Sequence, residues 1–309
     1  MKPPDSPAPR LPLKPLLLVL GAAATAYALA LALSADQGSP WATLGRLGSL
    51  ASLQAMALCL LNYLLRGLRW RMWMAAYGRP LGLVEGLRLY LAGYTFTPTP
   101  GNIGEAARGL MLAHHPLGAA QSLAIFGAER LADLLCLLLM CLPVAWWIAG
   151  LGGPVAYGLG LVAGLVVLGL LVLLSGFGQR LLQRLSWLRD ARQCLATQPL
   201  AWFSLTLLAW AAQGLAVWLL CRDAGLSIGV LQAAGFYAVA MVGGALSLLP
   251  AGLGGMEALL TGLLVVHGAG AAQALGITVL ARVLTLWLAV AIGALALVYS
   301  AAIRDISFK

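Results

Sequence analysis

Charged residues are scarce in this sequence: Asp, Glu, Lys and Arg fill only 9% of its 309 positions, against about a quarter of an ordinary soluble domain. Hydrophobic residues make up 61%, and the mean hydropathy is +0.92. This composition indicates an all-α integral membrane protein. A spanning helix takes about 20 apolar residues, so the length holds roughly six to eight passes. We expect one membrane domain over residues 1–309, with no room for a separate soluble catalytic domain.

Clusters that could hold a metal ion or a disulfide framework are also missing from the sequence. Its five cysteines are scattered, and neither a CxxC nor a Cys/His cluster occurs. No GxSxG or HExxH motif is present, and the glycines of residues 101–104 and 252–255 follow no predicted strand, as a nucleotide fingerprint would. We expect no cofactor and no metal, and no enzyme class is indicated.

Acidic residues are outnumbered by basic ones, 10 against 19, which gives a formal charge of +9. In a soluble chain this excess would suggest binding to nucleic acid. Here the arginines lie beside apolar stretches, so orientation in a membrane explains them better. We expect no nucleic-acid partner.

Apolar windows predict six spanning helices. They cover residues 15–34, 47–70, 119–149, 154–175, 199–221 and 271–300. The first window could imitate a signal peptide, but it is longer than a signal h-region and lacks a clear cleavage box. We therefore interpret it as a spanning helix.

Two further segments are shorter and interrupted. Residues 83–97 and 105–114 flank a Pro- and Gly-rich stretch at 97–104, and residues 230–249 and 257–267 flank another at 250–255. Such clusters break helices, and a broken helix at membrane depth is tolerated only beside protein or a water-filled cavity. The sequence therefore predicts two re-entrant helical hairpins in addition to the six spans.

The basic residues predict the orientation of this arrangement. Six spans place both termini on one side, because a re-entrant hairpin returns to the face it entered. That face receives fourteen basic residues and the other only two, Arg46 and Arg222. The fourteen are Lys2, Arg10, Lys14, Arg66, Arg69, Arg71, Arg79, Arg88, Arg180, Arg184, Arg189, Arg192, Arg304 and Lys309. The positive-inside rule makes this face cytoplasmic, in a bacterial-type inner membrane.

The loop over residues 176–198 is then predicted to be a cytoplasmic amphipathic segment. Its basic stretch at 179–192 fits a helix lying on anionic lipid. A solvated orientation signal fits it equally well.

The chain also contains an internal repeat. A shift of 152 positions aligns residues 98–130 with 250–282, with 12 identities in 33 ungapped positions. The matched residues include Pro98 and Pro250, Glu105 and Glu257, His115 and His267, Gln121 and Gln273, and Arg130 and Arg282. We expect repeats of approximately 47–149 and 199–300 with inverted topology, since their hairpins enter from opposite faces. Inverted repeats are typical of secondary transporters, so this architecture favours transport over catalysis.

The repeated arginines are candidates for binding an anionic headgroup. Arg130 and Arg282 each lie 11 residues into a predicted helix, about 16 Å deep and near the middle of a hydrocarbon core of about 30 Å. A charge there should face a cavity or a partner. Arg130 has Glu129 and Asp133 nearby, so an Arg130–Asp133 pair that only locks the helices stays open as an alternative. Arg282 has no acid in its own helix and is freer to bind a ligand or Glu257.

The repeated glutamates each begin the second half of a hairpin. Glu105 and Glu257 could simply cap these half-helices; we favour a gate in which each glutamate exchanges arginine partners, with Glu129 and Asp133 in the same charge network. The half-helix N-termini, at Asn102, Gly104 and Gly254, would offer backbone N–H groups to the headgroup, with Arg108 as a third phosphate contact. The two matched histidines, at the hairpin ends, fit proton handling less well than an interfacial polar role.

Four stretches occur in the order found in a known family. They are Arg66-Gly67-Leu68-Arg69-Trp70-Arg71; Thr97 to Glu105 with Arg108; Glu129-Arg130 with Asp133; and Leu249 to Glu257 with Arg282. With these motifs the chain resembles, over nearly its whole length, the flippase-like family named after the transmembrane region of lysylphosphatidylglycerol synthase. The resemblance implies a module that moves lipid between leaflets, without fixing which lipid. No aminoacyl-transfer domain follows, so synthase activity is not expected. Asn102 stands where the family often has a basic residue, which weakens a direct phosphate role there.

Two classes of function follow. The favoured one is a flippase that moves an anionic phospho- or polyprenyl-linked lipid by alternating access. The other is an integral-membrane enzyme or accessory subunit acting on such a lipid. The partner in both is a membrane lipid with a phosphate-containing headgroup, and the sequence indicates no oligomeric state.

Overall fold

The computed structural model describes residues 45–110, 112, 116–151, 154–175, 186–247 and 249–303, together with positions 21 and 25. This part of the chain is 86% helical and contains no strand. The helix predicted at residues 15–34 lies outside the described residues, apart from those two positions. The all-helical prediction is confirmed for the rest.

The predicted helices from residue 47 onward are present. They are α3 (Leu50–Ala76), α5 (Ala119–Leu151), α6 (Pro154–Leu174), α9 (Pro199–Asp223), and α12 (Ala271–Arg282) continued by the π-helix η6 (Val283–Trp287) and α13 (Leu288–Ala302). Within the described residues, four helices are long and apolar enough to cross a membrane: Leu50–Ala76, Ala119–Gly150, Pro199–Asp223 and Ala271–Ala302. The protein is therefore a multi-pass membrane protein.

Both interrupted segments are broken helices in the structure. The first consists of α4 (Leu83–Ala92) and two 3-10 helices, η3 (Gly93–Phe96) and η4 (Pro100–Gly109). The second consists of α10 (Val230–Leu246), the 3-10 turn η5 (Pro250–Gly252) and α11 (Gly255–Val266). Positive φ angles mark the breaks, at Asn102 (56°) and at Ala251 (53°).

The first segment differs from its prediction in its second half. A helix was expected over residues 105–114, but η4 begins at Pro100, ends at Gly109 and has 3-10 geometry. Pro98 and Pro100 supply no backbone N–H, and the Gly104 N–H donates to the Thr99 hydroxyl rather than to a helical carbonyl. The backbone there is thus held by side chains.

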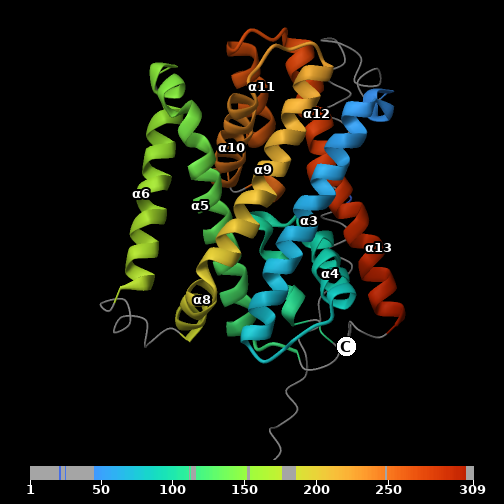
Figure 1. Ribbon diagram of the computed structural model, residues 1–309, viewed down its shortest axis with the longest axis vertical. Helices are drawn as coiled ribbons and strands as arrows, with labels where there is room; N and C mark the ends of the chain where they lie inside the picture. Colours follow the sequence, from blue (N-terminus) through green and yellow to red (C-terminus); the bar gives the residue numbers. More distant parts are fainter. Residues whose placement is uncertain are drawn as a thin grey trace, which may run out of the picture.

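Figure 1 shows how these elements are arranged. Helices α3 and α9 lie side by side at the centre and run in opposite directions, α10 and α11 lie toward one end of the molecule, and α4 lies toward the other. The Asn62 amide of α3 donates to the Ala209 carbonyl of α9 at 2.7 Å. Helices η4 and η5 contact each other between the two ends. The two broken segments therefore meet inside the molecule although they approach from opposite ends.

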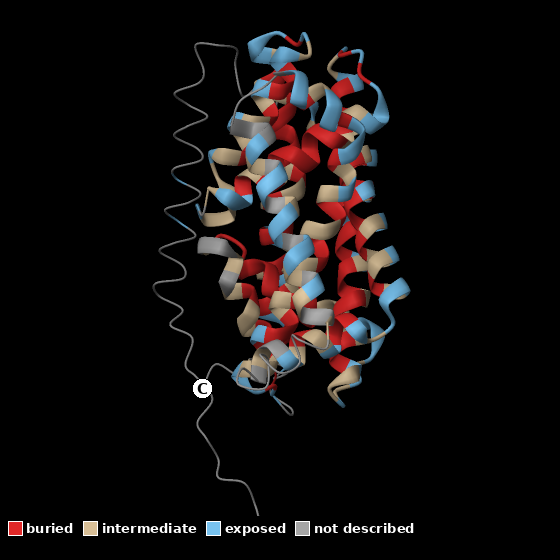
Figure 2. Cartoon of the chain, turned by 90° about the vertical axis from the view of Figure 1, so that its left-hand side faces the viewer, coloured by how far each residue is buried: buried red, intermediate tan, exposed pale blue. Residues whose placement is uncertain are grey.

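The distribution of buried residues agrees with this arrangement of the helices. Figure 2 shows buried residues along the inner sides of the helices and exposed residues on the outer sides. Many outward residues are large and apolar, such as Trp146, which is 91% exposed, and Leu295, which is 74% exposed. Since lipid tails are as apolar as leucine, this surface suits a bilayer.

One inference from the charges is wrong. Arg66 and Arg69 were assigned to the cytoplasmic surface, but α3 continues past them to Ala76 and both side chains are buried. Beyond the end of the helix lies Gly78, whose φ is +70°; the N–H groups of Gly78 and Arg79 bond back to the carbonyls of Ala75 and Met74. Without the two arginines the predicted cytoplasmic face keeps twelve basic residues against two.

Close packing of α13 on the first broken segment gives a prediction about stability. A Cβ at Gly293 would lie 2.7 Å from the Thr95 backbone nitrogen and 2.9 Å from the Leu91 carbonyl oxygen. Gly293→Ala should therefore destabilise the protein by about 1 to 3 kcal/mol, measured as a lower midpoint of thermal unfolding in detergent. Gly262→Ala, also in a helix but with nothing within 4 Å of its Cβ, is the matched control and should not lower the midpoint. Equal midpoints for both variants would contradict this packing.

Candidate functional site

A buried cluster of seven charged side chains joins α3, η4 and α5. Its members are Arg66, Arg69, Glu105, Arg108, Glu129, Arg130 and Asp133. We call it the charge cluster. Two of its arginines, Arg66 and Arg69, come from the last three turns of α3.

Asp133 is the centre of the charge cluster. Its carboxylate accepts from Arg66 Nη2 at 2.7 Å, from Arg69 Nη1 at 2.8 Å and from the indole N–H of Trp210 at 3.2 Å, and Arg130 Nη2 lies 3.3 Å away. Its side chain is only 5% exposed. Because an unpaired buried charge is costly, these contacts fix the positions of three helices, α3, α5 and α9.

The other two carboxylates bind Arg108 from either side. Glu105 lies 3.0 Å from Arg108 Nη2, and Glu129 lies 3.2 Å from Arg108 Nη1. Glu105 also accepts from the Thr97 hydroxyl at 2.8 Å and lies 3.4 Å from Arg130. The guanidinium of Arg108 stacks on Tyr90, 4.3 Å from the ring centre. Both terminal nitrogens of the Arg108 guanidinium are thus paired with carboxylates of the protein.

The charge cluster contains four arginines and three carboxylates, so with every group ionised it carries one surplus positive charge. Most of its side chains are at most 9% exposed, whereas that of Arg130 is 27% exposed. The Arg130 guanidinium is therefore where the surplus charge can meet a ligand.

The second repeat has one matching ion pair. Arg282 Nε donates to Glu257 at 2.6 Å, and Arg282 Nη2 donates to the Ala251 carbonyl at 2.9 Å. Glu257 and Arg282 are 25 residues apart, as are Glu105 and Arg130. Glu257 also accepts from the Gly254 N–H at 2.8 Å. It therefore caps α11 and pairs with Arg282 at once in this conformation.

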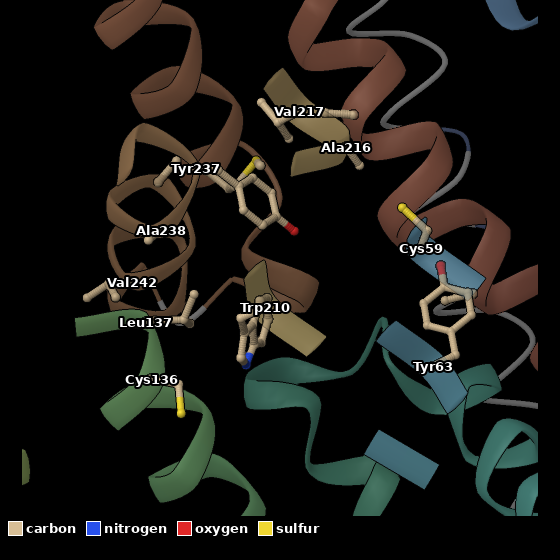
Figure 3. Packing of buried hydrophobic residues seen from close by; sticks show 14 of the residues in the cluster. Cys59, Tyr63, Cys136, Leu137, Trp210, Ala216, Val217, Tyr237, Ala238 and Val242 are labelled. Carbon is tan, nitrogen blue, oxygen red and sulfur yellow. The ribbon is translucent and has the colours of Figure 1, made fainter. Parts of the chain in front are cut away.

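Arg130 and Arg282 face the same polar cavity. Its volume is about 80 Å³. The lining residues are Tyr63, Arg66, Tyr94, Thr97, Asn102, Glu105, Arg130, Trp210, Gln213, Tyr237, Met241, Ala251, Arg282, Thr285, Leu286 and Ala289. Figure 3 shows Tyr63, Trp210 and Tyr237 from α3, α9 and α10 around this region. The lining thus draws on both repeats.

Not every predicted contact reaches this cavity. Arg108 is absent from the lining described above, and the Gly104 and Gly254 N–H groups are already bonded to Thr99 and Glu257. In this conformation the Gly104 and Gly254 N–H groups stabilise the two helix breaks.

The predicted histidines lie away from the cavity or outside the described residues. His115 is among the residues not described. His267 contacts the Gln232 amide and the Ser227 carbonyl, each at 3.2 Å, and so ties the end of α11 to the region around the start of α10. Among the described residues no three His, Cys, Asp or Glu side chains are grouped to bind a metal ion.

Reasoning from the sequence missed several residues of the site. Arg66 and Arg69 carried a detectable signal, because arginines at i and i+3 lie on one helical face. Gln213 is a buried amide within the mostly apolar α9, where it accepts from the Tyr237 hydroxyl at 2.9 Å. Trp210 gave no signal, since a tryptophan in a membrane helix has many uses.

The comparison with protein families agrees with this description. The family described as the lysylphosphatidylglycerol synthase TM region matches residues 17–293, and the chain belongs to that family. Membership connects it to lipid-modifying or lipid-handling functions in a membrane. A search of curated proteins found no match.

The central position of Asp133 predicts a large effect of its removal. Asp133→Asn keeps the shape of the side chain but leaves Arg66 and Arg69 without their nearest carboxylate. We expect a loss of about 3 to 5 kcal/mol of stability, measured by thermal unfolding in detergent. Asp190→Asn is the control, because Asp190 pairs only at 3.9 Å with the exposed Arg189, and should cost about 0 to 1 kcal/mol. Similar midpoints for the two variants would refute the central role of Asp133.

Proposed function

We propose that this member of the lysylphosphatidylglycerol synthase TM region family moves an anionic lipid with a phosphate-containing headgroup between membrane leaflets. The observation that carries the proposal is the pair of arginines, Arg130 and Arg282, on one cavity beside a charge cluster with a surplus positive charge. Guanidinium groups bind phosphate oxygens in bidentate geometry, so two of them suit such a headgroup.

The arrangement of the helices supports transport by alternating access. The broken segments approach from opposite ends and meet at η4 and η5, as expected for inverted repeats of approximately 47–149 and 199–300. The repeats also share a small local contact: the N–H groups of Gly118 and Gly270 each donate to a glutamine three residues later, at 3.3 Å. Related halves of this kind can adopt two exchanged conformations of similar energy.

The alternative is an enzyme or accessory subunit that acts on the same lipid. What favours transport is the approach of the two broken segments from opposite ends, an arrangement typical of secondary transporters. Product analysis separates the two classes, since a flippase leaves its lipid chemically unchanged.

The two repeats hold their hairpins with unequal strength. Glu105 belongs to a cluster of seven charges, whereas among the described residues Glu257 pairs with one arginine, Arg282. The π-helix η6 directly follows Arg282, and π-helical turns often occur at functional sites. In this proposal the pair of Glu257 and Arg282 breaks more readily, and the charge cluster acts as the more rigid half.

Substitution of Arg130 and Arg282 is the main test of the proposed function. In liposomes containing fluorescent phosphatidylglycerol, Arg130→Gln and Arg282→Gln should each slow transfer between leaflets at least about tenfold, since a charged hydrogen bond contributes about 1.5 to 3 kcal/mol. Lysine at either position should also impair transfer, because an ammonium group lacks the bidentate fork. Arg189→Gln, at a surface position, is the control. Wild-type rates in folded Arg130→Gln and Arg282→Gln proteins would exclude this site.

The proposed orientation places both termini and α8 (Ser186–Ala196) on the cytoplasmic side of a bacterial inner membrane. The Tyr77 hydroxyl donates to the Asp190 carbonyl, so the Arg-rich end of α3 lies beside α8, and Ser49 bonds to Asp223 at the other end. The segment between Arg71 and Arg79 therefore shares an end with Arg189 and Arg192.

Labelling with an impermeant thiol reagent tests the orientation. All five native cysteines are buried, so added cysteines should dominate the signal. Ser227→Cys should be labelled on intact cells, and Arg189→Cys only after permeabilisation. The reverse pattern would invert the orientation.

The gate is tested by removing each glutamate charge. Glu105→Gln and Glu257→Gln should bias the protein toward opposite sides, because their hairpins approach from opposite ends. A coupling of about 1 to 3 kcal/mol shifts populations roughly 5- to 150-fold, which labelling of Thr285→Cys in the cavity from each side can detect. Identical accessibility in both variants and in the wild type would leave the glutamates as structural caps.

A further inference from the structure

A second, larger cavity adjoins the polar one. Its volume is about 240 Å³. Its walls come mainly from α5, α10 and the start of α11, and its lining residues are Asn102, Arg130, Asp133, Leu134, Leu137, Trp210, Met241, Gly244, Ala245, Leu249, Ala251, Gly252 and Met256. Apart from Asn102, Arg130, Asp133 and Trp210, this lining consists of glycine, aliphatic residues and methionine. We call it the apolar arm.

The apolar arm and the polar cavity share part of their walls. Asn102, Arg130, Trp210, Met241 and Ala251 line both. The Arg130 guanidinium therefore stands at the boundary between a polar space and an apolar one. An anion bound to Arg130 would have room for an apolar substituent on the side of the apolar arm, whereas its other side would face the polar cavity.

The other end of the arm reaches the outer surface of the protein. Leu249 in its lining is 48% exposed, and Ala245 is exposed as well. Leu246, next along α10, is 53% exposed. In a membrane these positions would face lipid, so the arm connects the neighbourhood of Arg130 with the hydrocarbon region through apolar surface.

We infer that the apolar arm binds the first carbons of an alkyl chain whose anionic headgroup is held at Arg130. This inference rests on the proposed function and specifies its ligand as an amphiphile whose chain lies next to its anionic group. A volume of about 240 Å³ is below the roughly 300 to 1,000 Å³ of sites that enclose a whole ligand. The arm therefore takes only the chain next to the headgroup, and the remainder stays in the bilayer.

The need for such an arm follows from the chemistry of a lipid. Burial of a chain in protein gains little over burial in the bilayer, since both are apolar. A chain that crosses polar groups, in contrast, would leave them unsatisfied. A headgroup can reach Arg130 only if its chain has an apolar route, and the arm is that route.

Binding of three small probes to the full chain in a neutral detergent tests the inference. Methyl phosphate carries the headgroup alone, hexyl phosphate adds a chain, and hexyltrimethylammonium carries the chain with the opposite charge. Hexyl phosphate should bind at least about tenfold more tightly than methyl phosphate, because buried methylene groups add affinity. Hexyltrimethylammonium should not compete with either. Arg130→Gln should weaken both phosphates together.

Filling the arm should remove only the advantage of the chain. Ala245→Trp and Leu134→Trp place bulk in the lining and should reduce the ratio of the two phosphate affinities to below about twofold, with methyl phosphate unchanged. Leu246→Trp, exposed and outside the lining, is the matched control and should keep the wild-type ratio.

The possible failures are distinguishable. If neither phosphate binds the wild-type protein, the proposed anion site and the arm are both refuted. If methyl and hexyl phosphate bind equally, the anion site stands and the arm is refuted. If the preference for hexyl phosphate survives both tryptophan substitutions, the chain lies elsewhere and the inference is overturned.

Discussion

The cost of an unpaired charge inside a membrane protein determines the architecture around Arg130. Four arginines enter the interior from α3, η4 and α5, and three carboxylates pair with them. Most of these pairs join two elements, as Arg66 and Arg69 of α3 do with Asp133 of α5, so the charges that must be neutralised hold the helices together. One positive charge is left over, and Arg130, the most exposed arginine of the cluster, lines the polar cavity. The same set of charges therefore holds the helices together and leaves one positive charge to bind an anion.

Several features could be read from the sequence because each leaves a local pattern. Hydropathy gave the helices from residue 47 onward, and the Pro and Gly clusters gave both breaks. The matched Glu105 and Arg130, and Glu257 and Arg282, were recognisable as repeated charges in apolar surroundings, and each pair is in contact. The partners of Asp133 were not recognisable. Arg66 and Arg69 follow an apolar run, as loop charges do, and only the three-dimensional crossing of α3 and α5 brings them to Asp133.

The two halves of the site differ in a way that suits transport. Alignment of the repeats places Thr285 opposite Asp133 and Ala281 opposite Glu129, so the second half lacks the carboxylates that bind three arginines in the first. Its single pair, Arg282 with Glu257, borders the π-helix. In the proposed mechanism the rigid half keeps the headgroup site in place while the weakly held half opens.

Mass spectrometry of the lipids that co-purify with the protein tests the central claim most directly. The surplus positive charge at Arg130 predicts that anionic phosphate-containing lipids are enriched over their proportion in the source membrane. It also predicts that this enrichment disappears in Arg130→Gln protein purified in the same way. A co-purified lipid profile equal to that of the membrane, or one unchanged by Arg130→Gln, would contradict an anionic headgroup site at this arginine.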